Sequence, residues 1–420
     1  MKKCAFTIVA KNYIGLAQIL EHSIKAQHDD VDFWIFVADE MENSHQLNCQ
    51  RIIFAKQSLG YDAETWTSMA FKYDLTEFCT TIKPACFQHL MALGYDHLIY
   101  FDPDIYVFSP LTDIFHWLDQ YHMVLTPQVR NIHVDYPGEH PEWAMNVNGI
   151  FNLGFCAVRN SPLIADIMQW WRTRLIDNSF ADRSVGNFTD QKWMDWMPAL
   201  LGTERLYVSR HLGMNMAPWN FFERRLFMDG NRIMVANRQV YSPDESQPLV
   251  FLHFAGYDYQ QLKKGVVARK RIETLKDYDD IHLAADIYSQ ALVREQHLFD
   301  NFINQTYSYA TYENGEQIAS FHRRLYHGML LNGQNMGNPF ATGSGSFYQA
   351  IKKRGLTGHA PVDRLSRSTI SNIEGKRKMI ALLFSILYRL IGYKRYVPFV
   401  KSLYDYCRPE FHTFLIKKPK

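Results

Sequence analysis

Apolar runs and amphipathic stretches alternate through residues 6–254. Phe6–Ala10 and Phe33–Ala38 are mostly apolar, whereas Gly15–Ala26 between them places its apolar side chains at helical spacing. Short apolar runs bounded by polar residues are typical of strands that are covered on both faces. The order strand, helix, strand therefore predicts an α/β fold with a mostly parallel sheet flanked by helices.

The same patterns continue towards residue 254. Helices are predicted at Ile82–Leu93, Pro162–Ile176 and Gln191–Leu201, and strands at Leu98–Phe101, Met123–Thr126, Ile150–Val158 and Leu249–Phe254. The polar stretch Val129–Asn148 is long for a connection within a compact domain. We interpret it as a lid or an acceptor loop, with a disordered connection as the alternative.

The composition changes after residue 270. Residues 1–270 are predicted to form the α/β domain, and residues 271–330 a helical extension. Residues 331–375 are rich in Gly, Ser, Asn and Thr, which indicates a linker or a weakly ordered segment. Residues 376–420 form a basic amphipathic C-terminal segment, with eleven Lys and Arg against two acids in a chain whose net charge is +2.

This C-terminal segment carries an apolar stretch, Met379–Ile391, between its basic clusters. The stretch is shorter than the roughly 20 residues that span a bilayer, and it suits a helix that lies in the membrane interface. We therefore expect contact with an anionic membrane surface. The alternative is a helix that packs on the domain and leaves its basic face in water.

Charge and cysteine content limit the classes of function. The 45 Lys and Arg balance 43 Asp and Glu, so no field that would attract nucleic acid is expected. The six cysteines form no Cys-x-x-Cys pair, which is typical of a reduced, cytoplasmic protein. Met1-Lys2-Lys3 leads into a short apolar run that predicts a first strand rather than a signal peptide. With the basic segment, this predicts a peripheral protein on the cytoplasmic face of a membrane.

The strongest candidate chemistry lies where the strand Leu98–Phe101 leads into Asp102-Pro103-Asp104. Burying a carboxylate is costly unless a cation or hydrogen bonds compensate for the lost water. Pro103 keeps Asp102 out of the helical region, and side chains two apart in an extended segment point the same way. The pair is therefore predicted to hold a divalent cation. Two other Asp-x-Asp pairs lie among polar residues and are expected at the surface: Asp30/Asp32 and Asp277/Asp279.

Other polar residues lie at predicted strand ends or before predicted helices: Asn152, Asp190, Gln191 and His253. In open parallel sheets, ligands bind outside the carboxyl ends of the strands. Two carboxylates and one imidazole can hold Mn²⁺ or Mg²⁺ and leave positions open for a substrate. A diphosphate is the expected occupant, because a divalent metal bridges its oxygens and neutralises a departing phosphate.

Six pieces of the chain resemble, in order and spacing, the GT-A nucleotide-sugar glycosyltransferases. Within them, the match is to the retaining, family 8-like type related to glycogenin and bacterial lipopolysaccharide galactosyltransferases. The pieces are Ile8–Tyr13, Thr80–Cys86, Phe101–Asp104, Phe151–Phe155, Thr189–Gln191 and Leu252–Gly256. Two features depart from the family pattern. Its Lys-Pro-Trp after the last glycine is absent, with Lys263 or Lys264 as the nearest substitute, and Asn12 stands where an Asp is common.

The resemblance implies a role for each matching residue. It implies that Asp102, Asp104 and His253 bind the metal and that Asp190 and Gln191 are catalytic. It also implies the GT-A fold with a helical C-terminal extension, a Mn²⁺ or Mg²⁺ ion, a UDP-sugar donor, a glycan or lipid-linked acceptor, and transfer with retention. The donor-binding residues that it implies are Ala10, Asn12, Tyr13, Lys83, Asp102, Asn152, Gly154, Gly256 and Lys263.

Other interpretations stay open at this point. The fold could serve a non-catalytic sugar-binding or assembly subunit. A strand that ends in Asp-x-Asp also occurs in haloacid dehalogenase-type phosphohydrolases, although Tyr106 and the lack of a later Gly-Asp motif argue against that family. Lys83 could be a solvated helix residue, Asp190 a helix cap and His253 a hydrogen-bonded core histidine. Three further residues could serve either the fold or the site: Asn152, Trp219 and Asn220.

Overall fold

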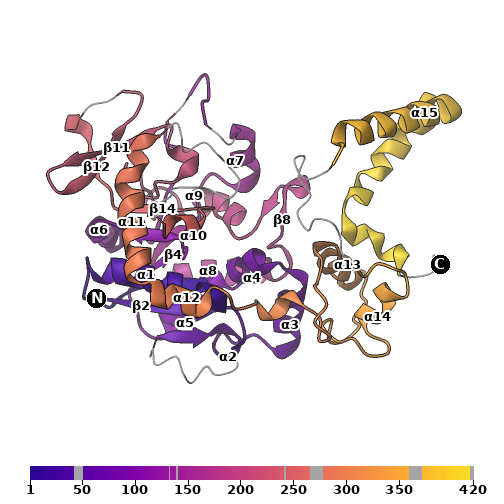
Figure 1. Ribbon diagram of the computed structural model, residues 1–420, viewed down its shortest axis with the longest axis horizontal. Helices are drawn as coiled ribbons and strands as arrows, with labels where there is room; N and C mark the ends of the chain where they lie inside the picture. Colours follow the sequence, from indigo (N-terminus) through magenta and orange to yellow (C-terminus); the bar gives the residue numbers. More distant parts are fainter. Residues whose placement is uncertain are drawn as a thin grey trace. The chain divides into compact units, whose positions relative to one another are not determined.

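The structure is a computed structural model that describes residues 1–41, 51–131, 133–138, 141–240, 243–264, 278–358 and 371–416. The chain forms two compact units (Figure 1). The first unit comprises Met1–Tyr61 and Leu75–Ser308, and the second comprises Asp62–Asp74 and Tyr309–Lys420. The chain therefore enters the second unit early, for one helix, and returns to the first. This division differs from the expected boundary at residue 270.

A seven-stranded sheet forms the centre of the first unit. Its order is β10-β6-β7-β4-β1-β2-β3, and the neighbouring strands are parallel except at β7, which runs antiparallel to β4 and β6. This confirms the predicted α/β fold with a mostly parallel sheet. The strands are β1 (Lys3–Val9), β2 (Val31–Val37), β3 (Ile52–Phe54), β4 (His97–Phe101), β6 (Met123–Leu125), β7 (Phe155–Arg159) and β10 (Leu206–Val208).

Helices cover both faces of this sheet. Alternate side chains of a strand point to opposite faces, so Val9 of β1 joins a core with α1 and α6, while the Phe6 ring meets Phe87 of α5 at 4.7 Å on the other face. Helix α5 packs beside α8. The helices of this unit are α1 (Ile14–Lys25), α2 (Ala55–Ser58), α4 (Leu75–Thr81), α5 (Lys83–Ala92), α6 (Thr112–Gln120), α7 (Glu142–Asn148), α8 (Pro162–Asp177), α9 (Met197–Leu201), α10 (Tyr259–Leu262), α11 (His282–Arg294) and α12 (Gln296–Phe302).

Three predicted helices are observed with ends that shift by one residue: α1, α5 and α8. The cap of α8 follows sequence rules, because the Ser161 side chain accepts a hydrogen bond from the amide of Ile164 and Pro162 occupies the first turn. The helix predicted at Gln191–Leu201 is instead a 3₁₀ segment, η4 (Gln191–Trp196), followed by the short α9.

The strand predicted at Ile150–Val158 begins only at Phe155. Residues before it form a turn, in which the amide of Phe155 bonds the carbonyl of Asn152 at 3.4 Å, and the amide of Leu153 bonds the Gln191 side chain. These backbone groups are directed to a side chain and a turn rather than to a neighbouring strand, which shortens the strand. The predicted loop Val129–Asn148 ends in helix α7, and its residues 132, 139 and 140 lie outside the described part.

Two smaller sheets of this unit were not predicted as such. A hairpin of β11 (Arg224–Asp229) and β12 (Arg232–Asn237) is joined by β13 (Gln247–Pro248), and β14 (Phe251–His253) pairs antiparallel with β5 (Ile105–Val107). Strand β14 confirms the apolar core of the run predicted at Leu249–Phe254. A two-stranded sheet of β8 (Ala181–Asp182) and β9 (Asn187–Phe188) completes the unit.

The second unit has its own core of aromatic side chains. Phe71 of α3 (Ala63–Lys72) packs on Tyr326 of α13 (Ser320–Leu331) and on Phe347 of α14 (Phe347–Lys352), with ring centroids 4.9 and 5.7 Å away. Residues 331–375, expected as a linker, therefore include a buried helix, because their few large apolar side chains fill this core. Residues 359–370 lie outside the described part.

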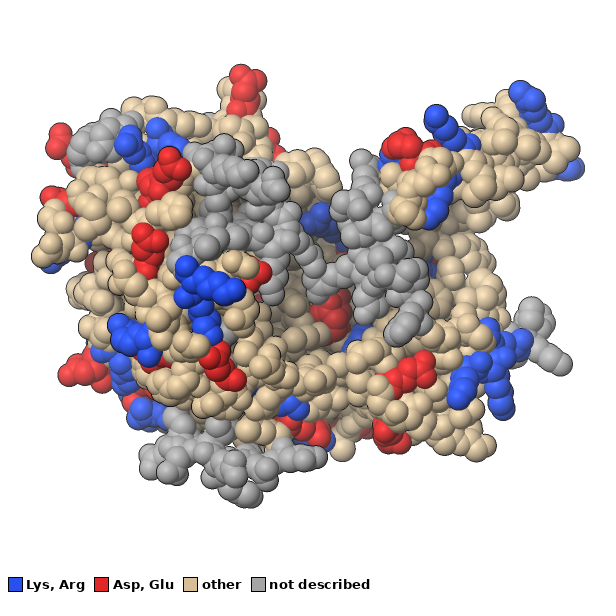
Figure 2. All heavy atoms as spheres, in the orientation of Figure 1, with Lys and Arg blue, Asp and Glu red and all other residues tan. Residues whose placement is uncertain are grey.

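The C-terminal segment is two structures rather than one. Helix α15 (Ile373–Leu403), described along its whole length, buries none of its residues. It breaks at Gly392 (φ 69°), and Tyr396 folds back to within 5.3 Å of the Tyr388 ring. Beyond it, η11 (Pro409–Leu415) packs on α13. Figure 2 shows Lys and Arg side chains among uncharged ones over α15, at the upper right.

Among the described residues, no helix is both long enough and apolar enough to cross a membrane.

Candidate active site

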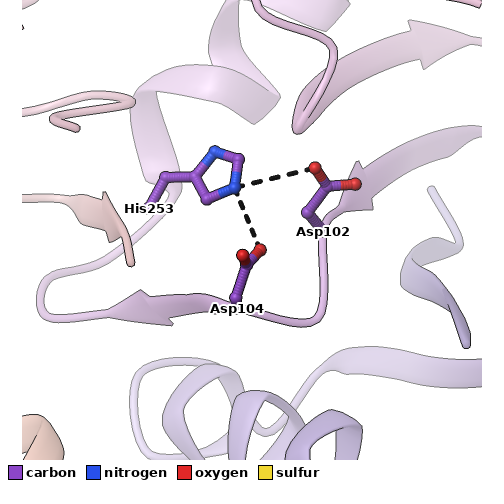
Figure 3. A group of neighbouring side chains, drawn as sticks. All are labelled: Asp102, Asp104 and His253. Carbon is purple, nitrogen blue, oxygen red and sulfur yellow. Dashed lines mark ion pairs between the residues drawn. The ribbon is translucent and has the colours of Figure 1, made fainter. Parts of the chain in front are cut away.

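Asp102, Asp104 and His253 lie together at the carboxyl edge of the sheet (Figure 3). The Nε2 atom of His253 is 2.9 Å from Oδ1 of Asp104 and 3.7 Å from Oδ2 of Asp102. One ligand atom from each residue lies within 4.8 Å of the others. The three side chains that the sequence associated are therefore brought into one cluster, and His253 faces carboxylates rather than apolar core.

Backbone pairing fixes this cluster. Asp102 ends β4, where its amide bonds the carbonyl of Gly154 at 2.8 Å. Asp104 is held on the other side, since its carbonyl accepts the amide of Phe254 at 2.8 Å, next to the paired strands β5 and β14. A tight turn closes between them, with the amide of Ile105 bonded to the carbonyl of Asp102. Pro103 thus sits in a short, doubly anchored turn that presents both carboxylates to one point.

Gly154 is required by this packing. A Cβ atom at residue 154 would lie 2.6 Å from Cε1 of His253 and 2.8 Å from Oδ1 of Asn152. Contacts this short do not occur in folded proteins, so a larger residue would displace the imidazole or the amide. The predicted donor role of Gly154 therefore has a structural counterpart, which is to leave room for His253.

The electrostatics of the cluster suit a cation. Burial raises the pKa of the Asp102 carboxyl, and the charges of Lys83 and His253 lower it in part. Burial would lower the pKa of His253, but the charge and hydrogen bond of Asp104 and the charge of Asp102 raise it overall. Two half-buried carboxylates share one imidazole, so a divalent cation between them would lower the repulsion of their charges.

The donor set fits Mn²⁺ or Mg²⁺. Two carboxylate oxygens and one imidazole nitrogen are ligands that these ions accept, and the cluster leaves further positions open. It is the one such cluster found among the described residues. Of the other Asp-x-Asp pairs, Asp30 pairs with Lys3 and Asp32 with Arg51 as surface ion pairs. Residue 277 lies outside the described part.

Lys83 and Asp190 form a buried ion pair beside this cluster. Their side chains are 1% and 2% exposed. Lys83 Nζ also donates to the carbonyl of Leu153 at 2.9 Å and lies 3.9 Å from the centroid of the Tyr100 ring. Lys83 is therefore not a solvated helix residue, and Asp190 makes no capping hydrogen bond to η4. The two side chains hold each other at the floor of the site.

The backbone at Thr189 directs Asp190 inward. Thr189 has a positive φ of 47°, which is strained for a β-branched residue and is found where the surroundings enforce it. Its hydroxyl donates to Oδ1 of Asp190 at 3.1 Å. The bend lets Asp190 face Lys83, while the next residue, Gln191, bonds Leu153 and Asn148.

Gln191 connects the end of helix α7 with the turn before β7. Its Oε1 accepts from the amide of Leu153 at 3.1 Å and from Nδ2 of Asn152 at 3.4 Å, and its Nε2 donates to the carbonyl of Asn148 at 2.9 Å. Asn152 in turn accepts the amide of Gly154 through Oδ1. The structure thus brings the predicted Asn152, Gly154 and Gln191 into one hydrogen-bonded network that borders the cluster.

Two residues of this network were missed from the sequence. Asn215 donates to Oδ1 of Asn152 at 3.2 Å and to the hydroxyl of Thr126 at 2.8 Å. Tyr100 donates to Oδ1 of Asp102 at 2.6 Å. Asn215 has a positive φ of 50°, and Asn is among the residues that tolerate this conformation, but the sequence around it shows no distinct turn pattern. Tyr100 belongs to an apolar strand, and such a run does not indicate that its hydroxyl reaches Asp102.

The residues after β1 form a 3₁₀ turn that carries a buried amide oxygen and a tyrosine. Ala10 caps the 3₁₀ turn η1 (Lys11–Tyr13), and Oδ1 of Asn12 is buried with no hydrogen-bond partner among the described residues. The pKa of Tyr13 is raised, first by burial and then by the charge of Asp104. The charge of Asp104 therefore acts on the side chain of Tyr13.

Two predicted donor contacts lie apart from the network. Lys263 Nζ pairs with Asp300 of α12 at 2.6 Å. Gly256 occupies a turn with φ 75°, where the amide of Tyr257 bonds the carbonyl of Phe254. That turn returns the chain after β14, so glycine has a backbone reason there. Trp219, by contrast, meets the His253 ring edge-on at 5.3 Å, so it borders the site.

No protein-family model matches the chain. A curated relative, the uncharacterized protein YfnF of Bacillus subtilis, is 22% identical over 257 residues, which cover 60% of this chain and 80% of YfnF.

Three of the similar solved structures are described as glycosyltransferases. The galactosyltransferase LgtC, solved with donor and acceptor sugar analogues, is 14% identical, with 72% of this chain and 97% of LgtC covered and a TM-score of 0.37. The bifunctional glycosyltransferase WbbM is 11% identical, with 72% and 52% covered and a TM-score of 0.39. GlyE of Streptococcus pneumoniae is 12% identical, with 74% and 67% covered and a TM-score of 0.36. Sequence identities and TM-scores of this size do not transfer an activity to this chain.

Proposed function

We propose that the protein is a metal-dependent glycosyltransferase. It moves a sugar from a nucleoside-diphosphate sugar, a UDP-hexose in our expectation, to a glycan or lipid-linked acceptor with retention. The observation that carries the proposal is the cluster of Asp102, Asp104 and His253 beside the buried ammonium of Lys83. A departing diphosphate is stabilised by such a combination of divalent cation and fixed positive charge.

The residues of the site would bind the donor, orient it and exclude water. A Mn²⁺ or Mg²⁺ ion held by Asp102, Asp104 and His253 would supply positive charge to the diphosphate oxygens. Lys83 is already fixed by two hydrogen-bonding partners, so its charge would need no reorganisation during the reaction. We assign Asp190 and Gln191 to the donor sugar. Both are buried and each is held by protein groups, which favours a precise orientation.

We assign the nucleotide to the loop after β1. The unpaired, buried Oδ1 of Asn12 is an acceptor for a base N–H, and Tyr13 offers a ring against which a base can stack. Ala10, Asn152, Gly154 and Gly256 would line the donor by backbone or small side chains. Lys263 would reach the donor only by leaving Asp300, so we rank it last among the donor contacts.

We further propose that the acceptor is assembled at the cytoplasmic face of a membrane, to which α15 binds. None of its residues is buried, and most large apolar residues of the stretch 379–391 are exposed, with Leu390 at 78%. A helix that is apolar around most of its circumference is stable only when protein or lipid covers that surface. The seven Lys and Arg of α15 match an anionic surface.

Metal dependence tests the central part of the proposal. Asp102→Asn and Asp104→Asn should each weaken Mn²⁺ binding at least tenfold by calorimetry in the presence of UDP. Release of nucleoside diphosphate from a nucleotide sugar should fall about a thousandfold, because a metal clamp is worth several kcal/mol and about 4 kcal/mol corresponds to that factor. Asp30→Asn, which removes half of a surface ion pair with Lys3, is the matched control and should change neither quantity.

The outcomes separate the rival functions. Mn²⁺ and UDP binding without release of nucleoside diphosphate, across a panel of nucleotide sugars, would favour a non-catalytic subunit. Full activity of Asp102→Asn in the presence of a chelator would refute the metal site itself.

A further inference from the structure

A surface cleft of about 680 Å³ lies on the first unit, next to η4. It is walled by two indoles and by short polar side chains, and it is distinct from the metal cluster. Its walls come from η4 and from the β8–β9 turn: Asn187, Lys192, Trp193, Asp195 and Trp196. A volume of this size is within the range of small-ligand sites.

The 3₁₀ geometry of η4 sorts its side chains onto separate stripes. At three residues per turn, positions i and i+3 are eclipsed. Gln191 and Met194 form the buried stripe, whereas Trp193 and Trp196 form a stripe that points to the cleft. Trp196 is 57% exposed. One face of η4 therefore contacts the hydrogen-bonded network of Gln191 and Asn152, and another face lines the cleft.

The indoles are fixed in place rather than loosely exposed. Trp193 Nε1 donates to the carbonyl of Asn178 at 3.1 Å. Trp170 of α8 packs behind both rings, with its centroid 5.8 Å from that of Trp193 and 6.4 Å from that of Trp196. Three indoles that brace one another form a rigid apolar platform, and such a platform loses little conformational entropy when it binds a ligand.

The polar rim suits a neutral, hydroxyl-rich ligand. Lys192 and Asp195 pair with each other at 2.8 Å, so their charges are balanced and the cleft attracts neither strong cations nor strong anions. Their remaining donor and acceptor capacity, with the amide of Asn187, can meet hydroxyl groups. An aromatic face together with a neutral polar rim is the chemistry that recognises a sugar ring, whose carbon-bound hydrogens form one apolar face.

The cleft and the Gln191 network are connected through one turn of the chain. Hydrogen bonds hold the turn at residues 148–150 at both ends. Gln191 Nε2 donates to the carbonyl of Asn148, and Oδ1 of Asp195 accepts the amide of Ile150 at 2.9 Å. Gly149, between them, has φ 111°. One short turn therefore separates the residue assigned to the donor sugar from the wall of the cleft.

We propose that this indole-walled cleft is an acceptor subsite that binds a sugar ring of the acceptor glycan, one or two units away from the hydroxyl that receives the transferred sugar. The inference rests on the proposed function for its role, because an acceptor presupposes transfer. It adds that the acceptor is an oligosaccharide rather than a single sugar. A ring bound in the cleft would lie on a different face of η4 from Gln191, which favours an acceptor of more than one sugar.

Trp196→Ala tests the subsite without touching the donor network. The full chain is applied to a printed array of oligosaccharides in the presence of a chelator, which leaves the metal cluster empty. We expect the wild type to bind a set of oligosaccharides and Trp196→Ala to lose at least tenfold of that signal. Trp196→Phe, which keeps an aromatic face, should retain most of it. Met228→Ala removes a similarly exposed apolar side chain on β11 and should bind as the wild type does.

A second measurement separates this inference from the proposed function. The shift of melting temperature by UDP with Mn²⁺ should be the same in the wild type and in Trp196→Ala, which shows that the variant is folded with an intact donor site. With an array-selected oligosaccharide as acceptor, the KM for acceptor should rise about tenfold while the KM for donor changes less than twofold. Absence of array binding by the wild type, or equal binding by Trp196→Ala, would overturn the subsite. Array binding without any release of nucleoside diphosphate would support the sugar-binding site and refute the proposed transferase activity.

Discussion

Lys83 and Asp190 were each assigned a ligand role from the sequence, yet in the fold they are first of all partners of each other. Both side chains are almost fully buried. Neither charge has water to stabilise it, so each depends on the other and on nearby polar groups such as the carbonyl of Leu153. Removing one partner leaves an uncompensated buried charge, which is costly, whereas removing both is far less so.

We therefore predict strong coupling in a double-mutant cycle. Lys83→Met and Asp190→Leu should each lower the free energy of unfolding by about 3–5 kcal/mol, and the double variant by much less than the sum. Urea unfolding measures all three. The exposed pair Lys56–Glu40, with side chains 41% and 47% exposed, is the control, and its cycle should give about 0–1 kcal/mol. Additive losses at Lys83 and Asp190 would show that the pair is not a unit.

At this scale, the sequence predicted the charged residues of the site and missed their supports. Asp102 and Asp104 stand out because they end an apolar strand, and the resemblance added His253. The partners of these residues are distant in sequence and chemically ordinary. Nothing around Asn215 or Tyr100 indicates that one holds Asn152 and the other Asp102. Only the fold brings them together.

Among the elements, those with strong local signals were predicted well. Helices α1, α5 and α8 carry helical periodicity, and α8 has a Ser-Pro start. The strand starts later than predicted, at Phe155, because an apolar run cannot reveal that the amide of Leu153 bonds the Gln191 side chain. The β11–β12 hairpin was missed although Gly230 with φ 57° occupies its two-residue turn. That Gly-Asn pair between alternating residues was a usable signal.

A buried acid, Glu223, holds the start of the loop Val129–Asn148. Glu223, 1% exposed, accepts the amides of Arg130 at 3.0 Å and Asn131 at 2.8 Å and lies 3.1 Å from Nε2 of His133. A carboxylate far along the chain therefore holds the first turn of the predicted lid or acceptor loop. The loop is an anchored element at its start, which local composition could not indicate.

We predict that Glu223→Ala releases this loop. The amides of residues 130 and 131 lose their acceptor, and an unsatisfied buried donor costs about 1–3 kcal/mol. Hydrogen–deuterium exchange should accelerate at residues 129–133 while the strands β1 and β4 keep their protection. Glu204→Ala, an exposed acid without such contacts among the described residues, should leave exchange unchanged. Undiminished protection in Glu223→Ala would assign the order of the loop to other contacts.

At the scale of the whole molecule, deleting the C-terminal segment is not a clean test of membrane binding. Deleting everything from residue 376 would also remove Glu410, which is buried and pairs with Arg324 of α13 at 2.5 Å, and whose backbone lies against Gly328. Such a truncation would damage the second unit, so a loss of function could not be attributed to the membrane. Substitution within α15 avoids this, because none of its residues is buried.

The final prediction concerns that helix. Replacing Leu382, Leu383, Ile386 and Leu390, which are 46–78% exposed, by Gln should abolish sedimentation with vesicles that contain anionic phosphatidylglycerol. The melting temperature should hold, since exposed substitutions usually cost within about 0.5 kcal/mol each. Wild-type binding should weaken with salt without vanishing, because each Lys or Arg near the surface contributes about 1 kcal/mol that screening removes, while apolar burial persists. Met228→Gln on β11 is the control for a general loss of surface hydrophobicity. If the four-site variant sediments like the wild type, or if it loses stability, α15 is not a membrane-binding element and instead packs against protein.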